Sequence, residues 1–280
     1  YMSIPTKELI RHALNDSCKV LRETAKRRHV SALYTDTDVG QALSNFYGMP
    51  YDEPFYLVPN KVKVTFFKNG HLVGAALILV QIYSSFSKEV INLLFTGDYN
   101  KKNMFFKVPD LPKWLYELPV TIIQESTYGN MDTTDIEECF EENILRGTRE
   151  QKTIVVPAFS LGRYQEVLYF LKTLQKRGAL DPNIPIYGDG KLAATYTNMF
   201  LNNPNLGIDS EMTDFLPENV EFISGSEARS NVIADIHSKI IVTTSGMGSY
   251  GPAQEYISKL ISNPNALIHF TGYTAEGTLG

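Results

Sequence analysis

The sequence has no long hydrophobic run, no leader-like opening and very few cysteines. No apolar stretch approaches the roughly 18 residues that a transmembrane helix needs, and no basic-then-apolar segment opens the chain. The two cysteines, Cys18 and Cys139, lie far apart, so neither a disulfide framework nor a zinc ribbon is indicated. We therefore expect no membrane segment and a reducing, cytoplasmic environment.

The sequence also lacks an excess of basic residues. It has 26 Lys and Arg against 31 Asp and Glu, a formal net charge of −5. Proteins that bind nucleic acid usually carry a basic footprint. Lys26-Arg27-Arg28 and Lys101-Lys102 are local basic clusters, and the ordinary interpretation of both is a solvated surface. Bound divalent metals could reverse the sign of the charge locally.

What the chain does have is ordinary globular composition over 280 residues, 43% hydrophobic and 20% charged. That length suits one large domain or two ordinary ones. Apolar residues recur every three or four positions over residues 6–28, which predicts an amphipathic helix. A second helix is expected over residues 35–47, where Thr35 and Asp38 have the spacing of a capping box.

Strands are expected after these helices. The pattern places them at residues 55–58, 62–67, 75–83, 90–96 and 120–124. Residues 84–89 would form the turn of a hairpin, and 101–119, with three prolines, would be irregular. The strands rich in Ile, Leu and Val, 120–124 included, are expected to be buried.

The sequence pattern changes after Gly129, where predicted strands and helices begin to alternate. Strands are expected at 153–157, 185–188, 221–224, 239–244 and 266–271, with helices at 161–177, 192–201, 227–235 and 252–262. This rhythm predicts a parallel sheet covered by helices. We therefore expect two domains, residues 1–129 and residues 130–280.

Three clusters of chemically capable residues follow strands of the first part. They are Gly70-His71, Thr96-Gly97-Asp98 and Glu125-Ser126-Thr127-Tyr128-Gly129. Each is unremarkable alone, because glycine, aspartate and histidine are common in turns and caps. Strand ends are, however, where such scaffolds usually place their chemistry.

The order and spacing of these clusters resemble the β-CASP nucleases of the metallo-β-lactamase superfamily, which include ribonuclease J and the pre-mRNA 3′-end cleavage endonuclease. The motifs read G-H-x-x-G-A-A, T-G-D and E-S-T-Y-G. Further similar stretches are VPAFSLGR from Val156, PIYGD from Pro185, TSGM from Thr244 and GYTAEGTLG from Gly272. Gly188–Ala193 departs from the family's usual run. The resemblance implies part of a metallo-β-lactamase αββα sandwich, with an inserted doubly wound parallel α/β domain after Gly129.

The resemblance also implies a site with two zinc ions. His71 would bind one zinc, Asp98 would bridge both, and Glu125 would orient a histidine that acts as general acid. Zinc suits such a site because it accepts imidazole and carboxylate and keeps a position open for water. Two metals can supply the nucleophile and the charge stabilisation that phosphodiester hydrolysis needs.

The family's remaining ligands come from an upstream H-x-H-x-D-H motif and from downstream histidines, and none of these motifs is in the sequence. Only His71 of the five histidines occupies a family position. We interpret His12, His29, His237 and His269 as structural. The complete site is therefore expected to need segments outside these 280 residues.

Two residues of the second part are weaker candidates for substrate binding. Ser160 and Arg163 lie where a strand gives way to a helix, and a helix N-terminus can hold a phosphate. Helix capping is an equally good explanation for both.

The function that the resemblance implies is zinc-dependent cleavage of RNA phosphodiester bonds. One alternative is a non-catalytic β-CASP scaffold subunit of an RNA-processing complex, against which the presence of His71, Asp98 and Glu125 argues. Another is a small-molecule metallo-hydrolase, against which the inserted domain argues. A dinucleotide-binding domain is disfavoured because no G-x-G-x-x-G follows the strand at 153–157. RNA is the expected partner, and a homo-oligomer is possible in principle.

Overall fold

The computed structural model describes residues 1–84, 89–129 and 136–280. The turn predicted at residues 84–89 therefore lies mostly outside the described residues. The chain folds into two compact units. The first unit is Tyr1–Gly129 with Asn203–Met212, and the second is Asn130–Asn202 with Thr213–Gly280. The segment 203–212 thus belongs with the first unit, which the sequence pattern does not indicate.

The first unit is built on a five-stranded sheet with the order β3-β4-β5-β6-β7. The strands are β3 (Phe55–Val58), β4 (Val62–Lys68), β5 (Ala76–Tyr83), β6 (Val90–Phe95) and β7 (Thr121–Ile123). Pairing is antiparallel from β3 to β6, and β7 joins β6 in parallel. Consequently β4, β6 and β7 run in the same direction, and their carboxyl ends lie at one edge of the sheet.

One face of this sheet carries an apolar cluster of Phe67, Leu79 and Leu94, covered by Leu115. Leu115 belongs to α3 (Lys113–Tyr116), a single turn that begins after Pro112. The expectation that residues 101–119 are wholly irregular is therefore wrong. Pro112 is the N-cap of this turn and has no N–H, so one of the donors that a helix start leaves without an intrahelical partner is absent.

Strand β7 is exposed, which contradicts the prediction of a buried strand at 120–124. Ile122 and Ile123 are 55% and 43% exposed. The reason is position in the sheet: β7 lies at the end of the strand order, and β6 is its one partner among the described strands. The apolar sequence therefore predicted the strand correctly, but the prediction that this strand is buried was wrong.

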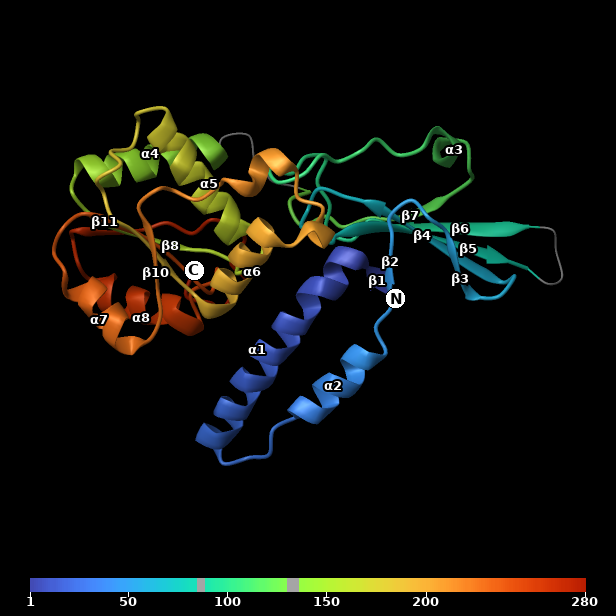
Figure 1. Ribbon diagram of the computed structural model, residues 1–280, viewed down its shortest axis with the longest axis horizontal. Coiled ribbons are helices and arrows are strands. Elements are labelled where there is room, and N and C mark those ends of the chain that lie inside the picture. The colour runs from blue at the N-terminus through green and yellow to red at the C-terminus, as the bar shows by residue number, and fades with distance from the viewer. Residues whose placement is uncertain (85–88, 130–135) are drawn as a thin grey trace. The chain divides into compact units, whose positions relative to one another are not determined.

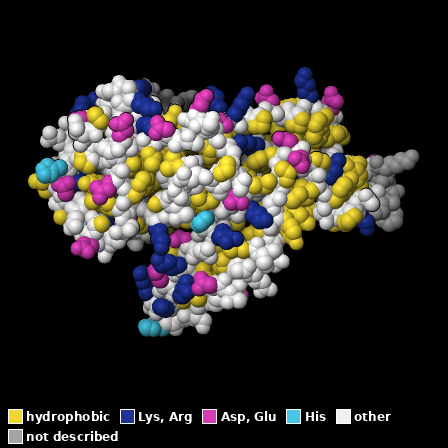
Figure 2. All heavy atoms as spheres, viewed as in Figure 1, with side chains coloured by type: hydrophobic (Ala, Val, Ile, Leu, Met, Phe, Trp, Pro, Cys, Tyr) yellow, Lys and Arg dark blue, Asp and Glu magenta, His cyan; other side chains and the backbone are white. Residues whose placement is uncertain are grey.

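Two helices complete the first unit. They are α1 (Ile4–Arg28) and α2 (Asp36–Ser44), beside a short parallel pair, β1 (Met2–Ser3) and β2 (Gly48–Met49). The predicted capping box is present, since the Thr35 N–H donates to Asp38 Oδ2 at 2.8 Å. Lys and Arg side chains gather along α1 (Figure 2) and include three in its last turn, where they complement the helix dipole.

The second unit contains a five-stranded sheet in which every pairing is parallel, with the order β10-β9-β11-β8-β12. The strands are β8 (Thr153–Pro157), β9 (Ile186–Asp189), β10 (Val220–Ile223), β11 (Lys239–Thr243) and β12 (Ala266–Ile268). Strands β8 and β11 are buried throughout, as the interior of a sheet covered on both faces requires.

Helices cover both faces of this sheet (Figure 1). They are α4 (Ile136–Arg149), α5 (Arg163–Lys176), α6 (Lys191–Asn202), α7 (Ser226–Ala234) and α8 (Gly251–Leu260), with 3₁₀ turns η1 (Pro204–Leu206) and η2 (Ser210–Thr213) in the chain after α6. Helices α7 and α8 share one face, where Val232 and Tyr256 pack on Ile241. Helix α5 contacts α6 on the other face, and Phe140 of α4 meets Phe170 of α5. The predicted doubly wound parallel arrangement is confirmed.

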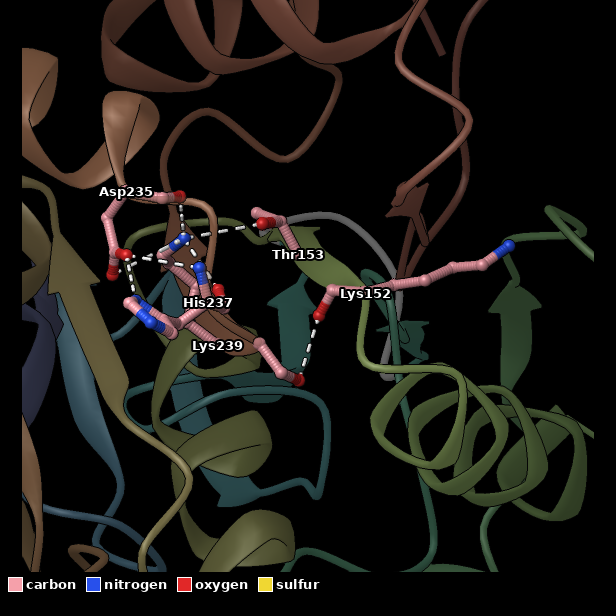
Figure 3. A network of polar contacts seen from close by, with 6 residues as sticks. Lys152, Thr153, Asp235, His237 and Lys239 are labelled. Atoms are coloured by element: carbon pink, nitrogen blue, oxygen red, sulfur yellow. Dashed lines mark hydrogen bonds and ion pairs between the residues drawn. The ribbon is translucent and has the colours of Figure 1, made fainter.

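A buried lysine fixes the start of β11 (Figure 3). Lys239 is fully buried and donates to the backbone carbonyls of Asp235 and His237, which follow α7. Its ammonium also lies 3.6 Å from Asp235 Oδ2, and burial lowers its pKa. A charge removed from water is tolerated when oxygens surround it, so this lysine joins the end of α7 to the sheet.

The carboxyl end of β9 carries a second buried ionic group. Asp189 accepts from Arg229 Nε at 2.7 Å and from the Tyr256 hydroxyl at 3.1 Å. Arg229 also donates to Glu255 at 2.7 Å. One strand and two helices, β9, α7 and α8, are thereby joined. No helix in the described part of the chain is long and apolar enough to cross a membrane.

Candidate metal centre

Three strands position the three motif clusters of the first unit. His71 follows β4, Asp98 follows β6 and Glu125 follows β7. Because these strands run in the same direction, the clusters lie at the same edge of the sheet. The polar residues are thus gathered by topology, although up to 54 positions of sequence separate them.

His71 and Asp98 converge as expected. His71 Nε2 lies 3.6 Å from Asp98 Oδ2, and the two side chains are 41% and 65% exposed. Two ligands of one tetrahedral zinc ion, each about 2.0–2.2 Å from the metal, are separated by about 3.3–3.6 Å. The distance between these two atoms therefore matches the separation of two ligands of a single tetrahedral zinc ion. Their role as ligands remains a prediction.

Asn69 holds the two site loops together, and sequence reasoning missed it. Its Oδ1 accepts from the His71 N–H at 2.9 Å, while its Nδ2 donates to the carbonyls of Asp98 and Thr96 at 3.3 and 3.4 Å. The side chain is almost fully buried. A single amide thereby fixes the backbone at both His71 and Asp98. In the sequence, only its position directly before Gly70-His71 could have indicated this role.

Gly70 permits the same loops to approach closely. Its N–H donates to the Asn100 carbonyl at 2.8 Å. A Cβ at this position would lie 2.5 Å from that oxygen and 2.6 Å from the Lys102 carbonyl oxygen. Only glycine avoids this clash, so the residue before His71 is dictated by backbone contact with the loop after Asp98.

Glu125 is held as an ionised carboxylate next to this pair. The Thr127 N–H donates to Glu125 Oε2 at 2.7 Å and is the main cause that lowers the pKa of Glu125. The Thr127 side chain and His71 lower this pKa further. Behind it, the Glu125 N–H donates to Thr96 Oγ1 at 3.2 Å, which joins the ends of β6 and β7. The Glu125 carboxylate can therefore accept a hydrogen bond or form an ion pair with a cationic group.

The described residues of the chain contain no group of three or more His, Cys, Asp or Glu side chains that could hold a metal ion. His71 and Asp98 are a pair of donors, and a tetrahedral site needs further ones. Two other histidines have structural contacts: His237 Nδ1 lies 2.6 Å from Asp235, and His269 packs on Phe140.

Ser160 and Arg163, the predicted substrate-binding residues, lie in the second unit at the start of α5. Arg163 pairs with Glu166 at 2.8 Å, and the Ser160 carbonyl accepts from Gln165 Nε2 at 3.1 Å. Gln165 Oε1 also accepts from the Gly162 N–H at 2.8 Å, which satisfies one backbone donor at the helix start. The contacts seen for both residues are local to this helix end, and substrate binding by either remains a prediction.

The sequence was compared with known proteins. Residues 164–280 match the Beta-Casp domain family. The whole chain is 30% identical to the transcription termination factor FttA of Methanosarcina mazei, of which it covers 44%. Over 90% of the chain it is 28% identical to an RNase J-like protein of Methanocaldococcus jannaschii, of which it covers 58%. It is 25% identical, over its full length, to the endoribonuclease YSH1 of Eremothecium gossypii, of which it covers 37%.

These relatives are considerably longer than the chain. The chain spans from about a third to somewhat over half of their length, and the match runs through both units.

Proposed function

Because this chain belongs to the β-CASP family, we propose that it is the part of a zinc-dependent ribonuclease that supplies one edge of the metal site. The observation that carries the proposal is the convergence of His71 Nε2 and Asp98 Oδ2 at 3.6 Å. The names of the relatives support RNA as the substrate, since two are an RNase J-like protein and an endoribonuclease.

His71 would hold one zinc ion and Asp98 would bridge two, with further ligands from other parts of the full-length protein. Bound zinc supplies Lewis acidity toward a phosphoryl oxygen. The chain's own contribution is preorganisation. Asn69 fixes the backbone of both ligands, so they keep their spacing without a metal to organise them.

Glu125 would orient the imidazole of a histidine from outside these residues. Its carboxylate is already held by Thr127 and remains ionised, which suits acceptance of an imidazole N–H. A histidine held in this way presents its other ring nitrogen in a fixed direction, as a proton donor to a leaving group requires.

The test uses the full-length protein with Asp98→Ala and Asp98→Asn. Both variants are expected to lose zinc and RNA cleavage together, because a bridging carboxylate offsets repulsion between two dications. Thermal melting of the metal-free protein should be unchanged, since the Asp98 side chain is mostly exposed. Asp110→Ala, an exposed carboxylate of the same unit, is the matched control and should keep both metal and cleavage.

Two outcomes would overturn the proposal. Full zinc content and normal cleavage in Asp98→Ala would show that Asp98 is not a ligand. A wild-type full-length protein that binds no zinc and cleaves no RNA would replace the enzyme with the scaffold alternative.

A further inference from the structure

The second unit has a groove of about 430 Å³ beside its edge strand β10 and the first turns of α6. The residues that line it are Gly190, Lys191, Ala194, Thr195, Asn198, Phe222, Ile223 and Ser224. Its volume is within the range of about 300–1,000 Å³ that small-molecule sites occupy. Strand β10 lies at the end of the strand order beside β9, so the groove lies at the open edge of the sheet.

The lining of this groove carries a positive charge. Among the described residues that line it, Lys191 is the one charged side chain, and none is a carboxylate. Lys191 is the first residue of α6, where no acidic residue occupies the first turn and Gly190 has no side chain that could cap the helix. A cation at the positive end of a helix opposes the helix dipole. The position of Lys191 is therefore unfavourable for the folded protein alone and favourable for a bound anion.

The wall of the groove is aromatic. Phe222 is 40% exposed, and its ring is the largest apolar surface in the lining. Polar side chains of Thr195, Asn198 and Ser224 surround it and can exchange hydrogen bonds with a ligand. An aromatic face beside amide and hydroxyl groups is the combination on which unpaired nucleobases stack and form hydrogen bonds.

A buried hydroxyl without a partner lies close to the same strand position as this ring. Tyr164 is fully buried, and its hydroxyl has no hydrogen-bond partner among the described residues. A Cβ on Gly188 would be 2.5 Å from that hydroxyl oxygen and 2.8 Å from Cδ1 of Phe222. The Tyr164 hydroxyl and the Phe222 ring therefore both lie close to Gly188 of β9.

We propose that the groove holds one nucleotide of single-stranded RNA, with its base against Phe222 and its phosphate at Lys191 and the first N–H groups of α6. The proposal rests on the proposed function for the identity of the ligand as RNA. A helix N-terminus with a lysine suits a phosphate. An extended peptide paired with β10 is the competing occupant. Binding of such a peptide would need neither Lys191 nor the hydrogen-bonding side chains of the groove.

The experiment measures binding separately from cleavage. A fluorescein-labelled oligouridylate is titrated into full-length protein carrying Asp98→Ala, so that the RNA stays intact. Adding Lys191→Ala should weaken binding and reduce the slope of log affinity against log salt by about 0.7, the value for one phosphate contact on a single strand. Adding Phe222→Leu should weaken binding about five-fold or more, and Phe222→Tyr should restore it.

The control is Lys259→Ala, an exposed lysine on α8 at the opposite face of the same sheet, which should not change the affinity. Lys191→Ala should melt no lower than the parent, because it removes a charge that opposes the helix dipole. Unchanged affinity in both Lys191→Ala and Phe222→Leu would overturn the proposal. If Lys191→Ala and Phe222→Leu weaken RNA binding but the unsubstituted full-length protein does not cleave RNA, the groove is supported and the proposed enzyme activity is contradicted. Failure of the groove proposal can therefore be told apart from failure of the proposed function.

Discussion

At the scale of single residues, Asn69 matters most for the candidate metal centre, because it acts through both proposed ligands without being one. Its amide bonds to the His71 N–H and to the Asp98 carbonyl from a nearly fully buried position. A buried polar group left without its partner typically costs about 1–3 kcal/mol.

Asn69→Ala should therefore lower the free energy of unfolding of the full-length protein and reduce its zinc affinity, by about 10–100-fold as for other groups that orient metal ligands. Asn69→Asp keeps the acceptor for the His71 N–H but places a buried carboxylate oxygen against the Asp98 and Thr96 carbonyls, so it should destabilise the fold at least as much as Asn69→Ala. Zinc titration and thermal melting check both. Equal zinc affinity in wild type and Asn69→Ala would show that the amide stabilises the loops without positioning ligands.

Residues differ in how far sequence could identify them. His71, Asp98 and Glu125 could be identified because the order and spacing of their three motifs resemble those of the β-CASP nucleases. Asn69, Lys191 and Phe222 carry no such signal alone. Their surroundings come from segments distant in sequence, such as the loop after β6 for Asn69, and no local pattern encodes a tertiary partner.

At the scale of secondary-structure elements, Arg229 is the contact that holds β9, α7 and α8 together. Its side chain is 13% exposed and bonds Asp189, which is almost fully buried, and Glu255. Removing one partner of a buried pair is expected to cost about 3–5 kcal/mol, because it leaves the other charge unpaired.

Arg229→Met should therefore lower the free energy of unfolding by about this amount, and adding Asp189→Asn should recover part of the loss. Chemical denaturation of the four combinations, wild type included, measures the coupling. Strictly additive effects of the two substitutions would show that the pair does not interact.

The junction between α7 and β11 should make stability depend on acid pH. The His237 backbone N–H, followed by the His237 side chain, lowers the pKa of Asp235, so the folded state favours the ionised carboxylate. A carboxyl whose pKa is lower in the folded state stabilises the protein above its unfolded pKa, about 3.9, and this contribution is lost as pH falls toward the folded value.

Asp235→Asn should accordingly be less stable than wild type at neutral pH, and the difference should shrink as pH falls below about 4. Thermal melts across this range test it, with Glu218→Gln, an exposed carboxylate of the same unit, as the control. A difference that stays constant from pH 7 to acid pH would mean that the ionised carboxylate contributes nothing.

Most elements could be predicted from the sequence, and the exceptions have physical causes. The strands of both sheets lie within a few residues of the predicted ranges, because their apolar runs end in turn residues. Helix α4 was not predicted, although Phe140 and Ile144 have helical spacing and are buried. The exposure of β7 could not be foreseen, since whether a strand lies inside a sheet or at its edge depends on the strand order.

At the scale of the whole molecule, the fold class follows from the change of rhythm after Gly129. Before it, antiparallel strands dominate. After it, strand and helix alternate, and every strand pairing of the second unit is parallel. The return of residues 203–212 to the first unit was not predictable, because this segment has no strong periodicity and is held by tertiary contacts such as the bond from the Asp209 N–H to the Phe105 carbonyl.

Anomalous scattering at the zinc edge, from crystals of the zinc-loaded full-length protein, shows directly whether His71 and Asp98 share a metal ion. A shared ion should give a peak about 2.0–2.2 Å from both His71 Nε2 and Asp98 Oδ2, and no peak there in Asp98→Ala. Stoichiometric zinc in the crystals with every peak away from both side chains would contradict it.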